Sequence, residues 1–159
     1  MLHKQGFTLI EVLAVVIIIT ILTSVAVPQY RRAIQKSHAT EAIAMLRVIN
    51  DSSERLAINY GYRDFKTMSS TNSPDKEYAS FTRMDMFDEH TLKCAIGDTT
   101  ITCEKFTYNL NRGGDYIAAS SNDGGATILL YRGDMPVLRC TGDEDLCDIY
   151  NIEYDEVNS

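Results

Sequence analysis

The sequence predicts an α+β fold in which a long amino-terminal helix packs on a carboxy-terminal antiparallel β-sheet. Three observations predict it: an apolar run over residues 7–27, apolar residues at helical spacing from there to Ile58, and short alternating segments with turn signals after Cys94. The chain has 159 residues, 45% of them hydrophobic, which suffices for one folded domain and a membrane anchor. Four antiparallel strands are enough to cover one side of a helix, so we expect the sheet on one face of it.

The apolar run is long enough to cross a membrane. As a helix, residues 7–27 span about 31 Å, close to the hydrocarbon thickness of a bilayer. A cleaved secretory signal peptide is the alternative, with Ser24-Val25-Ala26 as the cleavage site. Its apolar region would exceed the usual length of ~7–15 residues, and Pro28 lies just past the cut. We therefore predict a transmembrane helix over residues 7–27.

One acidic residue, Glu11, interrupts this apolar run. A carboxylate within a transmembrane segment costs roughly 2.5–3.5 kcal/mol on insertion scales and usually marks a functional pairing. One explanation is that Glu11 reaches the membrane surface. The other is a cationic partner: if the chain is cut after Gly6, the new α-amino group of Phe7 lies one helical turn away, and the same amine of a neighbouring copy would serve equally.

The segment KQGFTLIEVLAVVIIITILTSVAVPQY resembles the amino terminus of type IV prepilins. In that family a short basic leader ends in Gly, the next residue is usually Phe, and a Glu is the fifth residue of the mature chain. Gly6, Phe7 and Glu11 match this pattern. The resemblance implies that residues 1–6 are a leader, that a prepilin peptidase cleaves between Gly6 and Phe7 and N-methylates Phe7, and that Glu11 neutralises the amino terminus of an adjacent subunit during filament assembly.

We expect the helix to continue over residues 28–58 as an amphipathic half. After Pro28 this segment has no Gly or further Pro, and it carries apolar residues at helical spacing: Ala39, Ala42, Met45, Ile49 and Leu56. Pro28 lacks a backbone donor, so it predicts a kink. The family resemblance makes Pro28 an assembly residue as well, because the helix around this position can loosen in pilin fibres.

Residues 59–159 are expected to form a periplasmic or extracellular head. Its first part, from Asn59 to Lys93, is predicted to be a loop that packs on itself through Tyr60, Tyr62 and Phe65. In pilins the corresponding connection, the αβ-loop, is exposed on the fibre. Aromatic and basic residues in such a loop are more often packed and solvated than bound to nucleic acid, so no specific nucleic acid is inferred as a partner.

The strands are predicted after this loop. CAIGDTTITCEKFTYNL contains a Gly97-Asp98 turn signal followed by Phe106, Tyr108 and Leu110 on one face, which predicts a hairpin. DYIAAS, ATILLYRGD and PVLRC predict further strands of an antiparallel meander whose inner face rests on the helix.

The cysteines form an even set with local spacings, which predicts the disulfides Cys94–Cys103 and Cys140–Cys147 and an exported head. A zinc site is the alternative, although zinc ligands prefer spacings of about two to four residues. The second pair closes CTGDEDLC, which is similar to the disulfide-bounded region near the end of many type IV pilins.

The carboxy-terminal end is acidic. From Gly133 onward the chain has eight acidic residues and one arginine, and their balance equals the net charge of −7 of the whole chain. A solvated acidic edge is the favoured interpretation over a calcium site, because the ligand spacing of an EF-hand loop is absent from this sequence. An acidic edge also disfavours nonspecific DNA binding.

No sequence motif indicates catalysis. His3, His38 and His90 are far apart in the sequence, and there is no nucleophile motif or phosphate-binding glycine loop. Arg132-Gly133-Asp134 matches an adhesion tripeptide, but a turn is the simplest interpretation. We therefore predict a structural protein rather than an enzyme, with no cofactor and no metal.

Together with the resemblance, these observations predict a type IV pilus subunit. It would enter the inner membrane as a precursor and polymerise with itself and other pilins, through the inner-membrane pilus assembly machinery, into an extracellular pilus. Adhesion, twitching motility and DNA uptake are the roles the resemblance implies. The alternatives are a type II secretion pseudopilin and a monomeric, membrane-anchored, exported binding module.

Overall fold

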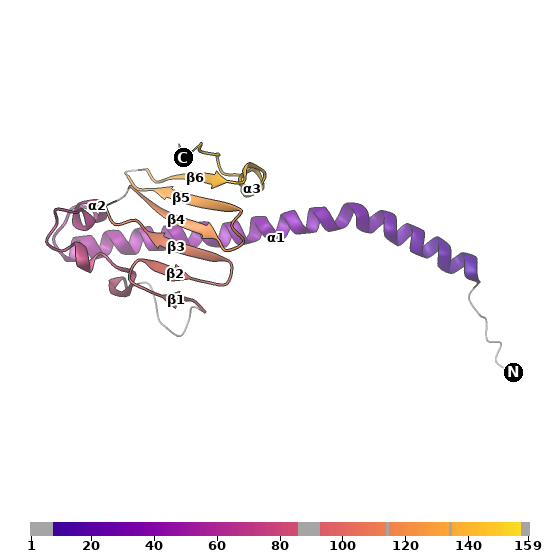
Figure 1. Ribbon diagram of the computed structural model, residues 1–159, viewed down its shortest axis with the longest axis horizontal. Helices are drawn as coiled ribbons and strands as arrows, with labels where there is room; N and C mark the ends of the chain where they lie inside the picture. Colours follow the sequence, from indigo (N-terminus) through magenta and orange to yellow (C-terminus); the bar gives the residue numbers. More distant parts are fainter. Residues whose placement is uncertain (1–7, 86–92, 114, 134, 157–159) are drawn as a thin grey trace. The chain divides into compact units, whose positions relative to one another are not determined.

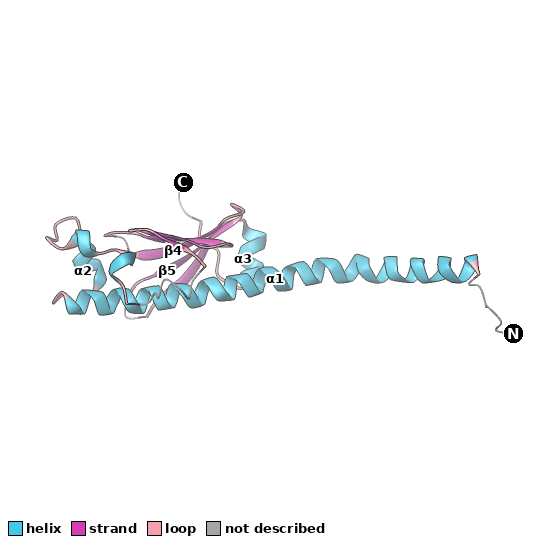
Figure 2. Cartoon of the chain, turned by 90° about the horizontal axis from the view of Figure 1, so that it is seen from below, coloured by secondary structure: helices cyan, strands magenta, loops and turns pink. Residues whose placement is uncertain are grey.

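The computed structural model describes residues 8–85, 93–113, 115–133 and 135–156. Its contacts divide the chain into two units, Met1–Gln35 and Lys36–Ser159, and each is described by itself. One helix, α1 (Leu9–Asn59), runs through both (Figure 1). In the second unit α1 lies along one face of an antiparallel sheet (Figure 2), so the predicted α+β fold is confirmed.

In the first unit, α1 is an apolar helix, and none of the described residues there is buried. Its large apolar side chains from Leu9 to Val27 are all exposed. The hydroxyl groups among them bond inside the helix, because Thr20 donates to the carbonyl of Val16 at 2.7 Å and Thr23 to that of Ile19 at 2.9 Å. A helix in lipid needs such internal partners for its polar groups. Among the described residues, α1 is the one helix with the length and composition to cross a membrane.

In the second unit, α1 buries one stripe of side chains at intervals of mostly three and four residues. The stripe comprises Ala39, Ala42, Leu46, Ile49, Asn50, Ser52, Ser53, Leu56 and Ala57. The sequence analysis placed Met45 in this stripe, but Met45 is only partly buried and Leu46 is buried in its place. Leu46 continues the four-residue step from Ala42, whereas Met45 lies at the side of the stripe and lines a surface groove.

The sheet has six strands in sequential order, all antiparallel to their neighbours. They are β1 (Ala95–Ile96), β2 (Thr100–Thr102), β3 (Phe106–Leu110), β4 (Tyr116–Ser121), β5 (Ala126–Tyr131) and β6 (Val137–Gly142). The predicted meander is confirmed. The hairpin predicted at Gly97-Asp98 is confirmed as β1 and β2, and a second turn between Thr102 and Phe106, which the sequence analysis did not predict, leads into β3.

The inner face of the sheet and the buried stripe of α1 form the core of the second unit. Phe106, Tyr108 and Leu110 alternate toward it as predicted. Ile117 in β4 and Ile128 in β5 are fully buried there. The alternation of buried and half-buried side chains along β3 is the pattern of a sheet covered on one face.

The connection between α1 and β1 contains short helices where the sequence analysis expected a loop. These are α2 (Phe65–Ser69) and the 3₁₀ turns η1 (Lys76–Tyr78) and η2 (Phe81–Arg83). Asp64 caps α2, since its side chain accepts a hydrogen bond from the backbone N–H of Thr67 at 2.8 Å.

The predicted packing of this connection is confirmed. Phe65 is buried, and the Tyr60 ring stacks on Tyr78 with centroids 5.3 Å apart. The hydroxyl of Tyr62 donates to a carboxylate oxygen of Asp75 at 2.8 Å.

The segment after β6 forms a helix, α3 (Glu144–Tyr150), where a disulfide-bounded loop was expected. Asp143 caps it by accepting hydrogen bonds from the N–H groups of Asp145 and Leu146. Acidic side chains at a helix amino terminus are favoured by the helix dipole, which accounts for the local cluster of carboxylates.

The chain then returns along the outer edge of β6. The N–H of Cys140 donates to the carbonyl of Glu153, and the N–H of Asp155 donates to the carbonyl of Cys140. The outer backbone groups of Cys140 in this edge strand are thereby paired with the chain's own tail.

Candidate functional site

The carboxylate of Glu11 caps the amino terminus of α1. Its Oε2 atom accepts hydrogen bonds from the backbone N–H of Thr8 at 3.0 Å and from the Thr8 hydroxyl at 2.8 Å. The Thr8 hydroxyl in turn accepts the N–H of Glu11 at 3.4 Å. This reciprocal arrangement is a capping box. A helix end has four N–H groups without internal partners, so an acceptor there is valuable where water is scarce.

Thr8 is a residue that the sequence analysis missed. Its signal was present, because Thr8-Leu9-Ile10-Glu11 fits the capping-box pattern of a Thr followed three residues later by a Glu, just before an apolar run.

The cap leaves part of the carboxylate unused. Within the described residues, Oε1 of Glu11 has no hydrogen-bond partner, and none of the ion pairs includes Glu11. A carboxylate accepts several hydrogen bonds, so Oε1 is available to a further donor. Gly6 and Phe7 lie outside the described residues, and the cleavage between them and the methylation of Phe7 stay predictions.

The apolar surface of α1 from Leu9 to Val27 surrounds the helix on all sides. A helix of this kind requires an apolar environment, supplied by lipid or by other helices. The helix continues through Pro28, and the missing N–H of this residue leaves the carbonyl of Ser24 without its usual backbone donor. The role of Pro28 in assembly stays a prediction.

Both expected cysteine pairs are joined as disulfides, Cys94 to Cys103 and Cys140 to Cys147. No cysteine is free, so the zinc alternative is wrong. Within the described ranges, no group of three or more His, Cys, Asp or Glu side chains is placed to hold a metal ion. In the acidic end, Asp143 caps α3 and Glu153 forms an ion pair with Arg139.

Arg132 connects the turn after β5 to α1 and α2. Its side chain is only 5% exposed, and its Nη1 donates to the hydroxyl of Ser53 at 2.9 Å. The same nitrogen lies 3.6 Å from Oε1 of Glu54, and the guanidinium lies 4.3 Å from the centroid of the Phe65 ring. Burial lowers the pKa of Arg132 to about 10, although the Glu54 carboxylate acts in the opposite direction.

This burial decides the interpretation of the tripeptide that begins at Arg132. An adhesion ligand of this kind presents its arginine to a receptor, whereas Arg132 is packed between Phe65 and α1. Asp134 lies outside the described residues. Arg132 is therefore a packed residue, and the turn expected over the tripeptide stays a prediction.

The family model of the prokaryotic N-terminal methylation motif matches residues 1–27. No solved structure matches the chain at a significant level. The match covers the expected leader, the cleavage position, Thr8, Glu11 and the apolar run.

Proposed function

We propose that this chain, which carries the amino-terminal methylation motif of type IV pilin-like prepilins, is a structural subunit of a type IV pilus. In this proposal a prepilin peptidase cuts between Gly6 and Phe7 and methylates the new amino terminus. The apolar half of α1 holds the subunit in the inner membrane, and the assembly machinery transfers it into a bundle with the helices of other copies. The chain itself has no catalytic role.

The observation that carries the proposal is the apolar surface of α1 from Leu9 to Val27, which is exposed on every side. Burying one Val, Leu or Ile side chain is worth about 1.5–3 kcal/mol relative to leaving it in water. Once such a helix leaves lipid, it stays stable only when other apolar helices surround it. A filament whose interior is built from these helices meets that requirement.

Glu11 supplies the order within such a bundle. Its Oε2 accepts hydrogen bonds from Thr8 of its own chain, and its Oε1 can accept one from a further donor. The α-amine of Phe7 on a neighbouring subunit is a cation that would satisfy it. A carboxylate and an ammonium brought together in an apolar bundle fix the register of adjacent helices, since any other register leaves a charge unpaired.

A type II secretion pseudopilin is the second candidate, because the amino-terminal motif alone does not separate the two classes. Two disulfides in one head, together with the acidic end, favour a pilin. A monomeric exported binding module is the third candidate. It would need no cut at Gly6 and would not associate through its helix.

The test is the intact mass and amino-terminal sequence of the protein in two fractions of its native host, the membrane and the filaments sheared from the cell surface. We expect chains in the sheared fraction to begin at methylated Phe7. Chains that begin after Ala26, or that keep Met1 and are absent from the sheared fraction, would overturn the proposal and favour the binding module.

A further inference from the structure

We propose that the Cys94–Cys103 disulfide is a thiol-exchange site, where an external low-molecular-mass thiol opens the bond while the Cys140–Cys147 disulfide stays closed. This inference concerns residues of the second unit alone and does not depend on the filament.

The two disulfides differ in access. Cys140 and Cys147 are completely buried in the core. Cys94 and Cys103 are only partly buried, and both line a groove of about 600 Å³ beside α1. Thiol–disulfide exchange requires a thiolate to reach a sulfur atom directly. An external thiol therefore reaches Cys94–Cys103 in the folded protein, whereas Cys140–Cys147 requires the core to open first.

The two disulfides also differ in how firmly the chain around them is held. Cys94 immediately precedes β1, an edge strand whose ladder has only two residue pairs, Ala95 with Thr102 and Ile96 with Ile101. Cys140 lies in β6, which pairs with β5 on one side and bridges to Tyr154 on the other. Short edge segments open at little cost, so a broken Cys94–Cys103 bond lets β1 separate from the sheet.

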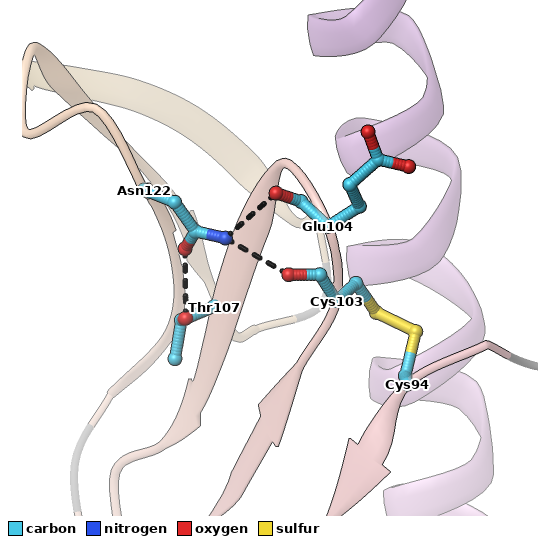
Figure 3. Close-up of a disulfide and its surroundings, with 5 residues drawn as sticks. All are labelled: Cys94, Cys103, Glu104, Thr107 and Asn122. Atoms are coloured by element: carbon cyan, nitrogen blue, oxygen red, sulfur yellow. Dashed lines mark hydrogen bonds between the residues drawn. A yellow bond between two sulfur atoms is a disulfide. The ribbon is translucent and has the colours of Figure 1, made fainter.

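Cys103 stays in place when the bond opens. Asn122, which follows β4, donates through Nδ2 to the carbonyls of Cys103 at 2.8 Å and Glu104 at 3.1 Å (Figure 3). Its Oδ1 accepts the hydroxyl of Thr107 at 2.8 Å, which orients the amide. The turn between β2 and β3 is thus held without the disulfide. The opened site has one fixed thiol, Cys103, and one that moves with β1, Cys94.

Charge does not prevent the approach of an anionic thiol. The groove is lined by Lys93 and Lys105 and by Glu41 and Glu104, so cations and carboxylates balance. Lys105 forms an ion pair with Glu104 at 2.9 Å, and Lys93 adjoins Cys94. A neighbouring ammonium favours the thiolate form of a cysteine, which helps the released sulfur to leave.

Two external thiols supply the two electrons that the reduction of one disulfide requires. The first external thiolate forms a bond to one cysteine sulfur and breaks the Cys94–Cys103 bond. The other cysteine sulfur leaves as a thiolate that takes up a proton. The second external thiolate attacks the external sulfur of this mixed disulfide, and the cysteine sulfur leaves as a thiolate that takes up a proton. The external thiols are thereby oxidised to one disulfide, and their two electrons reduce Cys94–Cys103 to two thiols.

The test exposes the folded, full-length protein in detergent to increasing concentrations of reduced glutathione. Free thiols are trapped by alkylation at intervals, and each cysteine is read by peptide mass. We expect Cys94 and Cys103 to react at least about ten times faster than Cys140 and Cys147, because local opening precedes global unfolding. Equal rates for the two pairs, or faster reaction of Cys140–Cys147, would overturn the proposal.

Hydrogen exchange tests which side of the opened bond moves. In the glutathione-reduced protein, the amides of β1 should exchange faster than in the oxidised protein, and those of β3 should not change. Equal acceleration in β1 and β3 would show that Asn122 does not hold the turn. Asn122→Ala should accelerate exchange at Cys94–Cys103 severalfold, whereas Asn109→Ala on neighbouring β3 should not. An unchanged exchange rate at Cys94–Cys103 in Asn122→Ala would also refute the conclusion that Asn122 holds Cys103 in place while Cys94 moves.

Discussion

The two halves of α1 share one secondary structure but have opposite surroundings. Ile17 in the first unit is 51% exposed, whereas Ile49 in the second is fully buried. The first half is apolar on every side, and the second is apolar along one stripe that faces the sheet. The second half finds its partner within the chain. The first half has no such partner among the described residues, and in the proposed function lipid or the helices of other copies surround it.

The largest expected effect is on the free energy of unfolding, and it distinguishes the two halves by the same isoleucine-to-alanine substitution made once in each. Ile49→Ala should lower the free energy of unfolding of the second unit by about 2–5 kcal/mol, because it leaves a cavity in a packed core. Ile17→Ala should change it by less than about 0.5 kcal/mol. Denaturant unfolding in detergent measures both. Equal destabilisation by the two variants would mean that the apolar half also supports the fold.

Arg132 tests how strongly the second half of α1 is tied to its surroundings. Arg132→Ala should lower the free energy of unfolding by about 1–3 kcal/mol, since it removes the donor to Ser53 and the packing on Phe65. Arg132→Met should lose less than Arg132→Ala, because it keeps the packing and removes a buried charge. If the methionine variant loses as much, the hydrogen bond to Ser53 outweighs the packing.

The cap of α3 should contribute less than Arg132. Asp143→Ala removes the acceptor for two N–H groups and should cost about 1 kcal/mol of stability. Asp148→Ala, an exposed acid later in the same helix, is the matched control and should be close to neutral. Thermal unfolding of both variants makes the comparison, and a loss at Asp148 as large as that at Asp143 would refute the capping role.

The smallest expected effect is a pH dependence at the end of α1. Hydrogen bonds from Arg55 and Ser52 lower the pKa of Asp85 to about 2. A carboxyl group with a lowered folded-state pKa stabilises the fold above its unfolded pKa of about 4, and this contribution disappears as the pH falls toward 2. The melting temperature of the wild type should therefore exceed that of Asp85→Asn at pH 5 and converge with it near pH 2. A gap that persists at pH 2 would rule out the ionised carboxylate as its source.

Local signals carried the correct predictions from sequence. The helix follows from an uninterrupted periodicity, and the three later strands from alternation between turn residues. The cysteines are paired with partners nine and seven positions away, so their local spacing pointed to the right pairs. The capping box of Thr8 and Glu11 was equally local and could have been identified.

The missed features lack such signals. β1 and β2 have two and three residues, too few to show a period. Arg132 and Ser53 are 79 positions apart, and no sequence pattern announces their contact. The buried Ser52 and Ser53 interrupt the apolar stripe of α1, which hides where the core ends.

The most direct test of the different roles of the two halves of α1 is the yield of sheared surface filaments from cells that express Glu11→Ala. Glu41→Ala, in the other half of the helix, is the matched control. We expect Glu11→Ala to reduce the yield to below about a tenth of wild type, as the loss of one partner of a buried ion pair would. The melting temperature of the second unit should not change, and Glu41→Ala should assemble normally. Normal filament yield from Glu11→Ala would contradict the assignment of the first half to assembly.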